Sequence, residues 1–240
     1  MSSRQRGRGG IPAPRRESGE GAVLKAFAAL LSYPDEHLQE ALGEIRSIVA
    51  ADRRITRADR ARVEALIQTL EHADLLELQE QYVALFDRGR ATSLNLYEHV
   101  HGDSRDRGQA MVDLVDIYQR GGLQLSTREL PDHLPVLLEY LSTRPYVEVR
   151  EMLVDCAHLL RAIGDALVKR QSPYAAILGA LLEIAGEDAL AAQPQAADEN
   201  DSKTLDEEWV EAPVLFGLGC GDARDNNAAA KPIRFVKKGA

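Results

Sequence analysis

Two histidines and an aspartate lie close together near the middle of the sequence, at His99, His101 and Asp103. Imidazole and carboxylate groups are common ligands of zinc and related metals, so this trio could form half of a metal site. Side chains two positions apart on a helix point about 200° apart, so joint ligation would require the helix to end near Glu98. The sequence has no His-x-x-x-His pair to complete the set. We therefore expect a turn held by polar side chains and no metal site.

A second candidate for chemistry is the adjacent pair Asp132 and His133. Such a pair could act as a general base and the group that orients it. No Ser or Cys nucleophile accompanies it in a recognisable motif, and no glycine-rich phosphate loop occurs elsewhere, so we expect no enzyme. Apolar residues follow the pair at helical spacing: Leu134, Leu137, Leu138 and Leu141. This pattern places the pair at the mouth of an apolar surface, which suits peptide binding.

Another apolar stripe precedes these residues. Its members occupy positions i, i+3, i+7, i+10 and i+11 of one helix face: Leu75, Leu78, Tyr82, Leu85 and Phe86. Core packing explains such a stripe simply, but Tyr82 and Phe86 are also large enough to line a groove. The sequence leaves both interpretations open.

The elements that must position these residues are helices. From Ala22 to about Leu190, apolar residues recur at helical spacing and strand alternation is almost absent. Tyr33-Pro34-Asp35 separates the first two helices, and Gly121-Gly122 closes a later one. We predict an all-α fold, a single irregular bundle of about eight helices over residues 21–190.

The start of the helix after Gly122 can also be predicted. Ser126 and Glu129 form a capping-box pattern, and Pro131 fits a first helical turn. We therefore expect a helix, or a short 3-10 turn leading into one, to begin near Ser126.

The two ends of the chain differ in charge from its body. Residues 1–20 carry five arginines among Gly, Ser and Pro, which predicts a disordered basic tail. Residues 191–240 form an acidic linker and a largely disordered tail. Within this tail, residues 209–216 include the apolar cluster Trp209, Val214, Leu215 and Phe216, which we expect to dock on the folded part.

Composition excludes several classes of function. The 240 residues contain 29 Lys and Arg against 38 Asp and Glu, a net charge of -9. This balance argues against nucleic acid as a partner and favours a basic partner. No uncharged stretch approaches the roughly 20 residues of a membrane span. Arg15-Arg16 invites a twin-arginine export signal, but charged residues interrupt the apolar region that would follow, so we expect a soluble cytoplasmic protein without membrane insertion.

Several stretches together resemble the NarJ family, the chaperones for assembly of respiratory nitrate reductase, within the wider TorD-like group. The likeness covers most of residues 23–186. It includes Leu31-Ser32-Tyr33-Pro34, the run from Tyr82 to Asp87, the block from Ser93 to Tyr118 and the segment 209–216. Residues 129–135 are also similar to the Glu-x-x-Asp-His signature of the group.

The resemblance implies an all-helical chaperone without catalysis of its own. Such proteins bind the N-terminal segment of the catalytic (alpha) subunit of nitrate reductase and keep it competent for insertion of the molybdenum cofactor before membrane docking. No cofactor would be bound permanently. A chaperone of a dimethyl sulfoxide or trimethylamine oxide reductase is an alternative, although the block from Ser93 to Leu114 favours the nitrate branch. A metal-dependent helical hydrolase built on His99, His101 and Asp103, with Asp132 and His133, is a third hypothesis.

These considerations define a predicted peptide-binding site. Its groove would be lined by Tyr82, Leu85, Phe86, Leu134, Leu137 and Leu138. Its rim would carry Asp132 and His133, with Glu98, His99 and His101 as second candidates. Core packing remains the alternative for each apolar residue. An amphipathic client helix with Arg or Lys would find an apolar groove and a favourable field there.

Overall fold

The computed structural model describes residues 21–101, 105–126 and 129–190. These residues form nine α-helices and two short helices of other types, and they contain no strand. The prediction of an all-α fold is therefore confirmed, with one α-helix more than the expected eight. The expectations for residues 1–20 and 191–240, the 209–216 segment included, lie outside the described residues, as does Asp103.

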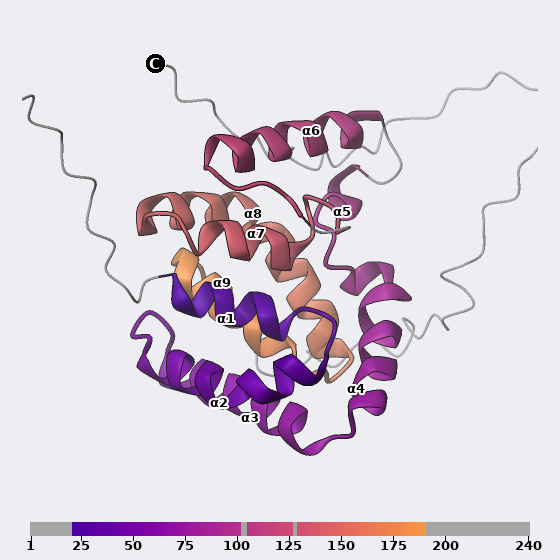
Figure 1. Ribbon diagram of the computed structural model, residues 1–240, viewed down its shortest axis with the longest axis vertical. Helices are drawn as coiled ribbons and strands as arrows, with labels where there is room; N and C mark the ends of the chain where they lie inside the picture. The colour runs from indigo at the N-terminus through magenta and orange to yellow at the C-terminus, as the bar shows by residue number, and fades with distance from the viewer. Residues whose placement is uncertain (1–20, 102–104, 127–128, 191–240) are drawn as a thin grey trace, which may run out of the picture.

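Figure 1 shows how the helices are arranged. In chain order they are α1 (Ala22–Leu30), α2 (Glu36–Ala51), α3 (Arg57–His72), α4 (Leu75–Tyr82), α5 (Glu98–His101), α6 (Arg105–Arg120), α7 (Leu134–Leu141), α8 (Tyr146–Lys169) and α9 (Ala175–Ala185). A π-helix, η1 (Val83–Asp87), continues α4, and a 3-10 turn, η2 (Arg90–Thr92), follows it.

Side-chain caps set the starts of three helices. Asp35 accepts a hydrogen bond from the Leu38 amide at 2.8 Å, just after the predicted Tyr33-Pro34 break. Thr56 caps α3 and Asp74 caps α4 in the same way. Such caps satisfy amides that have no partner within the helix. At the far end of α6, Gly122 adopts a φ of +80°, as expected for the residue that closes a helix.

The core is centred on α9, a helix that is apolar on nearly every side. It packs between α8 and α3, while α1 packs against α2 and α7 (Figure 1). Gly164 lets α8 and α9 approach closely: a Cβ there would lie 2.6 Å from Leu190 Cδ1 and 3.3 Å from Leu178 Cβ. Cys156, also on α8, is a free and fully buried thiol whose pKa burial raises to about 12.

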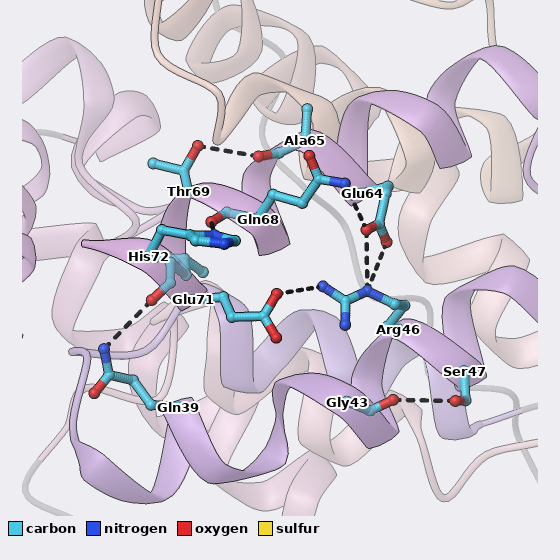
Figure 2. A network of polar contacts seen from close by, with 11 residues as sticks. Gln39, Gly43, Arg46, Ser47, Glu64, Ala65, Gln68, Thr69, Glu71 and His72 are labelled. Atoms are coloured by element: carbon cyan, nitrogen blue, oxygen red, sulfur yellow. Dashed lines mark hydrogen bonds and ion pairs between the residues drawn. The ribbon is translucent and has the colours of Figure 1, made fainter.

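An ion-pair network joins α2 to α3 at the surface. Arg46 of α2 lies 3.0 Å from Glu64 and 2.7 Å from Glu71, both on α3 (Figure 2). Gln39 adds hydrogen bonds to the last carbonyls of α3, Leu70 and Ala73. Pairs as exposed as these contribute little to stability, so we assign them mainly to fixing how the two helices align.

The π-helix changes the register of the chain after α4. The Arg88 amide donates to the Val83 carbonyl, five residues back, at 3.1 Å. The Thr92 hydroxyl donates to the Leu85 carbonyl. The hydrogen bond spans five residues here and not four as in an α-helix. The residues that follow are therefore rotated relative to their positions in an uninterrupted α-helix. Across the described ranges, no helix is both long and apolar enough to cross a membrane.

Candidate functional site

The apolar residues predicted to line a groove lie inside the protein. The exposed fraction is 5% or less for Tyr82, Phe86, Leu134, Leu137 and Leu138, and Leu85 is half-buried. In this conformation they pack in the core, which is the alternative that the sequence left open. Contact with a peptide stays a prediction, and it would require the helices around α7 to separate.

A row of aromatic rings crosses this region from the surface inwards. Tyr33, 51% exposed, meets the Tyr82 ring edge-on with centroids 5.6 Å apart. The rings of Tyr82 and Phe86 are 4.8 Å apart, and those of Phe86 and Tyr174 are 5.1 Å apart. The Tyr82 hydroxyl donates to the Leu31 carbonyl at 2.9 Å, and burial raises the Tyr82 pKa. The row therefore ties η1 to the end of α1 and to the start of α9.

Asp132 is completely buried, so it does not lie on an exposed rim in this conformation. Residues 94–97 run antiparallel to residues 132–134: the Leu96 amide donates to the Asp132 carbonyl, and the Leu134 amide donates to the Leu94 carbonyl. The Asp132 carboxylate accepts a hydrogen bond from the Tyr97 amide at 2.9 Å. Its other oxygen has no hydrogen-bond partner among the described residues. Asp132 therefore anchors the segment that leads into α5.

This backbone pairing explains why α7 starts later than predicted. The helix begins at Leu134, with His133 as its N-cap and Pro135 in its first turn. The expected start near Ser126 and the place assigned to Pro131 are wrong. Residues 131 and 132 form a turn in which the His133 amide donates to the Leu130 carbonyl at 3.0 Å. His133 is extended and pairs with Asn95, so the helix begins only at Leu134.

Burial shifts the pKa values of Asp132 and His133 in opposite directions. It raises the pKa of Asp132, although the Tyr97 amide and the charge of Arg107 act against it. It lowers the pKa of His133, with a smaller opposing effect of Glu129, whose carboxylate lies 3.7 Å from Nδ1. Burial thus favours the neutral form of both groups.

The second candidates for the rim serve local structure. Glu98 accepts a hydrogen bond from the Ser93 hydroxyl at 2.5 Å and pairs with Arg107 of α6 at 3.6 Å. His99 Nε2 lies 2.9 Å from the Ser93 carbonyl, to which it can donate. His101 belongs to α5, and its side chain lies outside the description.

Metal chemistry finds no support in this region. Within residues 21–101, 105–126 and 129–190, no three His, Cys, Asp or Glu side chains converge on a point where an ion could bind. His99 is instead within hydrogen-bond distance of a backbone carbonyl, and Asp132 is bound to a backbone amide. Nothing in the described part of the chain therefore favours the hydrolase hypothesis.

The structure reveals a cleft that the sequence analysis missed. It has a volume of about 800 Å³ and lies between α6, the end of α7 and the first half of α8; we call it the α8 cleft. Its apolar floor includes Ile117, Tyr140 and Leu141. Its α8 wall carries Val147, Glu148, Glu151, Val154 and Asp155. Val147 is 66% exposed and Val154 is 40% exposed, so the α8 wall presents two aliphatic side chains to solvent.

Charged side chains line the α8 cleft beside its apolar residues: three carboxylates and two arginines, a net charge of -1. Its three carboxylates, on Glu148, Glu151 and Asp155, have no ion-pair partner in the described part of the chain. Burial and the neighbouring Glu151 raise the pKa of Asp155.

The two arginines that line the α8 cleft keep their positive charge, but backbone carbonyls hold their guanidinium groups. Arg144 donates to the Gly121 carbonyl at 2.9 Å and lies over the Tyr140 ring. Arg150 donates to the Ala185 carbonyl at 3.1 Å. The cleft therefore suits a segment that combines basic and apolar side chains.

A sequence signal for this cleft exists in α8. The buried residues of the helix, such as Val149, Leu153 and Cys156, define one face. Val147 and Val154 are seven positions apart and lie off that face, with Glu151 between them. Two valines on an otherwise charged face are the sign of a second, partly apolar surface.

Comparison with known proteins now places this fold in a class. It is similar to a putative redox enzyme maturation protein from Archaeoglobus fulgidus, with a TM-score of 0.53 and 22% identity, covering 74% of this chain and 100% of that one. This likeness shows that the two proteins share an all-helical fold. The chain belongs to the NarJ family: the family model described as "Nitrate reductase delta subunit" matches residues 52–180.

Individual relatives support this assignment. The nitrate reductase molybdenum cofactor assembly chaperone NarJ of Escherichia coli K12 is 45% identical over 207 residues, covering 83% of this chain and 88% of that protein. The probable chaperone NarW of the same organism is 41% identical, covering 81% of this chain and 83% of its own length. A probable NarJ of Bacillus subtilis is 29% identical, covering 67% and 86%.

Proposed function

We propose that this protein is a dedicated chaperone of respiratory nitrate reductase. It binds the N-terminal segment of the apo catalytic subunit in the cytoplasm and keeps it competent for molybdenum cofactor insertion before membrane docking. The observation that carries this proposal is the 45% identity to the Escherichia coli NarJ chaperone over 83% of the chain. The molybdenum cofactor is cargo of the client, so we assign no residue of this chain to hold it.

The α8 cleft is where we place the client segment. It is an open surface on which exposed valines lie beside carboxylates that have no ion-pair partner within the described ranges, whereas the predicted groove residues are already packed in the core. An amphipathic segment with Arg or Lys would bury its apolar side chains on Val147 and Val154 and place its charges near Glu151 and Asp155. Complementary charges across an interface also favour correct docking over other partners.

The test is capture of the client by the full-length, tagged protein. Cells of the source organism would be grown without oxygen on nitrate, and the bound proteins identified by mass. We expect the catalytic subunit of nitrate reductase in its cofactor-free form, and loss of capture when the N-terminal segment of that subunit is deleted. Recovery of a dimethyl sulfoxide or trimethylamine oxide reductase instead would contradict the assignment of the client.

Two sets of variants test the placement of the client. Glu151→Lys combined with Asp155→Lys should reduce capture strongly, while Glu40→Lys combined with Glu44→Lys on the exposed face of α2 serves as the matched double charge reversal. Asp132→Ala tests the predicted rim in the same assay. Normal capture by a folded Glu151→Lys/Asp155→Lys protein, with loss in folded Asp132→Ala, would move the client to the predicted groove.

A further inference from the structure

The exposed valines and carboxylates of the α8 cleft are complementary to a segment of this same chain. Val147 and Val154 are seven positions apart, which is about 10 Å along a helix. Glu151 lies between them and Asp155 beside them, and neither carboxylate has an ion-pair partner among the described residues. A ligand for this surface therefore needs apolar side chains spaced by about 10 Å with cations next to them.

Residues 231–238 of the sequence have this composition. The segment reads Lys-Pro-Ile-Arg-Phe-Val-Lys-Lys, so Ile233, Phe235 and Val236 are interleaved with four basic residues. In a polyproline II conformation, which has three residues per turn, Ile233 and Val236 would lie on one face about 9 Å apart, close to the spacing of the two valines on α8. The basic residues 1–16 match less well, because Ile11 is their only branched aliphatic residue.

We propose that residues 231–238 dock in the α8 cleft of the same molecule. The apolar side chains of the segment cover Val147 and Val154, and its Lys and Arg side chains neutralise Glu148, Glu151 and Asp155. Because the segment and the cleft belong to one chain, the association is intramolecular and is favoured over capture of a free peptide of equal chemistry. The proposal rests on the cleft and the sequence alone and does not depend on the identity of the client.

The chain is long enough for this docking. The described part ends at Leu190, whose side chain packs beside Gly164 of α8. From Gly164 to Val154 is about 15 Å along the helix. The residues numbered 191–230 connect Leu190 to the segment, and a chain of that length can span more than about 100 Å when extended. The chain that follows Leu190 is therefore long enough for residues 231–238 to reach the cleft.

Carboxyl footprinting of the purified full-length protein tests the proposal. A carbodiimide and an amine would modify exposed carboxylates, and mass spectrometry would report each site. The test variant combines Lys231→Glu, Arg234→Glu, Lys237→Glu and Lys238→Glu. We expect modification of Glu148, Glu151 and Asp155 to rise several-fold in this variant, while Glu40 on α2 is modified equally in both proteins. Equal modification of the cleft carboxylates in the two proteins would overturn the proposal.

A charge exchange provides the matched control. Adding Glu151→Lys and Asp155→Lys to the reversed segment should restore protection of Glu148, because the two charges are again complementary. Two other occupants are distinguished in the same assay. If Arg15→Glu with Arg16→Glu exposes the cleft carboxylates and the reversal at 231–238 does not, the basic N-terminal residues are the occupant and the proposal fails. Protection that disappears on dilution would assign the cleft to a second copy and also overturn it.

Discussion

At the scale of single residues, Asp132 shows what sequence reasoning can and cannot find. Its position beside His133 and a leucine stripe marked it as important, and the structure does give it a specific partner, the Tyr97 amide. The expectation of an exposed rim did not anticipate its burial, because the pairing of residues 94–97 with residues 132–134 is a contact between distant parts of the chain. The spacing of residues within one segment does not predict a contact with a distant segment.

We predict that Asp132→Ala lowers the free energy of unfolding by about 1–3 kcal/mol, because it leaves the buried Tyr97 amide without its acceptor. Asp132→Asn keeps an acceptor oxygen and removes the titrating group. Since burial raises the Asp132 pKa, the folded protein binds this proton more tightly than the unfolded chain. Its contribution to stability is therefore present at low pH and is lost as the pH rises through the raised pKa.

The measurement is urea unfolding of parent and variants from about pH 4 to about pH 8. Relative to the parent, Asp132→Asn should gain stability as the pH rises. Asp165→Asn on the exposed side of α8 is the matched Asp→Asn control. A constant difference between Asp132→Asn and the parent across this range would show that the carboxylate is not perturbed by burial.

At the scale of elements, α8 combines two faces with different tasks. Its inner face packs on α9, where Gly164 permits close approach, and its outer face forms a wall of the α8 cleft. The sequence predicts helices well here, because a long amphipathic pattern has a single structural solution. It does not distinguish a core stripe from a groove, since Leu134, Leu137 and Leu138 would show the same spacing in either case.

We predict that Gly164→Val destabilises the protein by about 1–3 kcal/mol, because the added atoms would collide with Leu190 and Leu178. Gly43→Ala is the matched control on the exposed face of α2, where a Cβ meets no atom within 4 Å. That change should stabilise by about 0.5–1 kcal/mol through helix propensity. Thermal unfolding of the two variants distinguishes the cases, and a stabilised Gly164→Val would show that α8 and α9 are not in close contact there.

At the scale of the whole molecule, the aromatic row links segments far apart in the sequence. Tyr82 and Phe86 connect the end of α1 with the start of α9 through contacts that involve Leu31 and Tyr174. The sequence predicted that these rings share one helix face. It could not predict the π-helix that carries Phe86, because the insertion depends on the tertiary contacts that compensate for it.

We predict that Phe86→Ala costs about 3–5 kcal/mol of stability, as expected for a buried ring that packs against two others. Leu76→Ala on α4, where Leu76 is 64% exposed, should change stability by less than about 0.5 kcal/mol. Chemical denaturation measures both. If Phe86→Ala is as stable as the parent yet loses the client, Phe86 belongs to a binding surface and not to the core.

The buried thiol of Cys156 is a probe for opening of the core, because its labelling rate can be measured. A thiol with a pKa near 12 and no exposure reacts with a labelling reagent only when α8 lifts away from its neighbours. In a Cys220→Ser protein, the rate of labelling thus measures how often the core opens. A client that inserted among the buried leucines of α7 would have to accelerate this reaction, whereas one that rests in the α8 cleft would leave it unchanged or slow it. Comparing the labelling rates with and without the client therefore distinguishes entry into the core from binding at the surface.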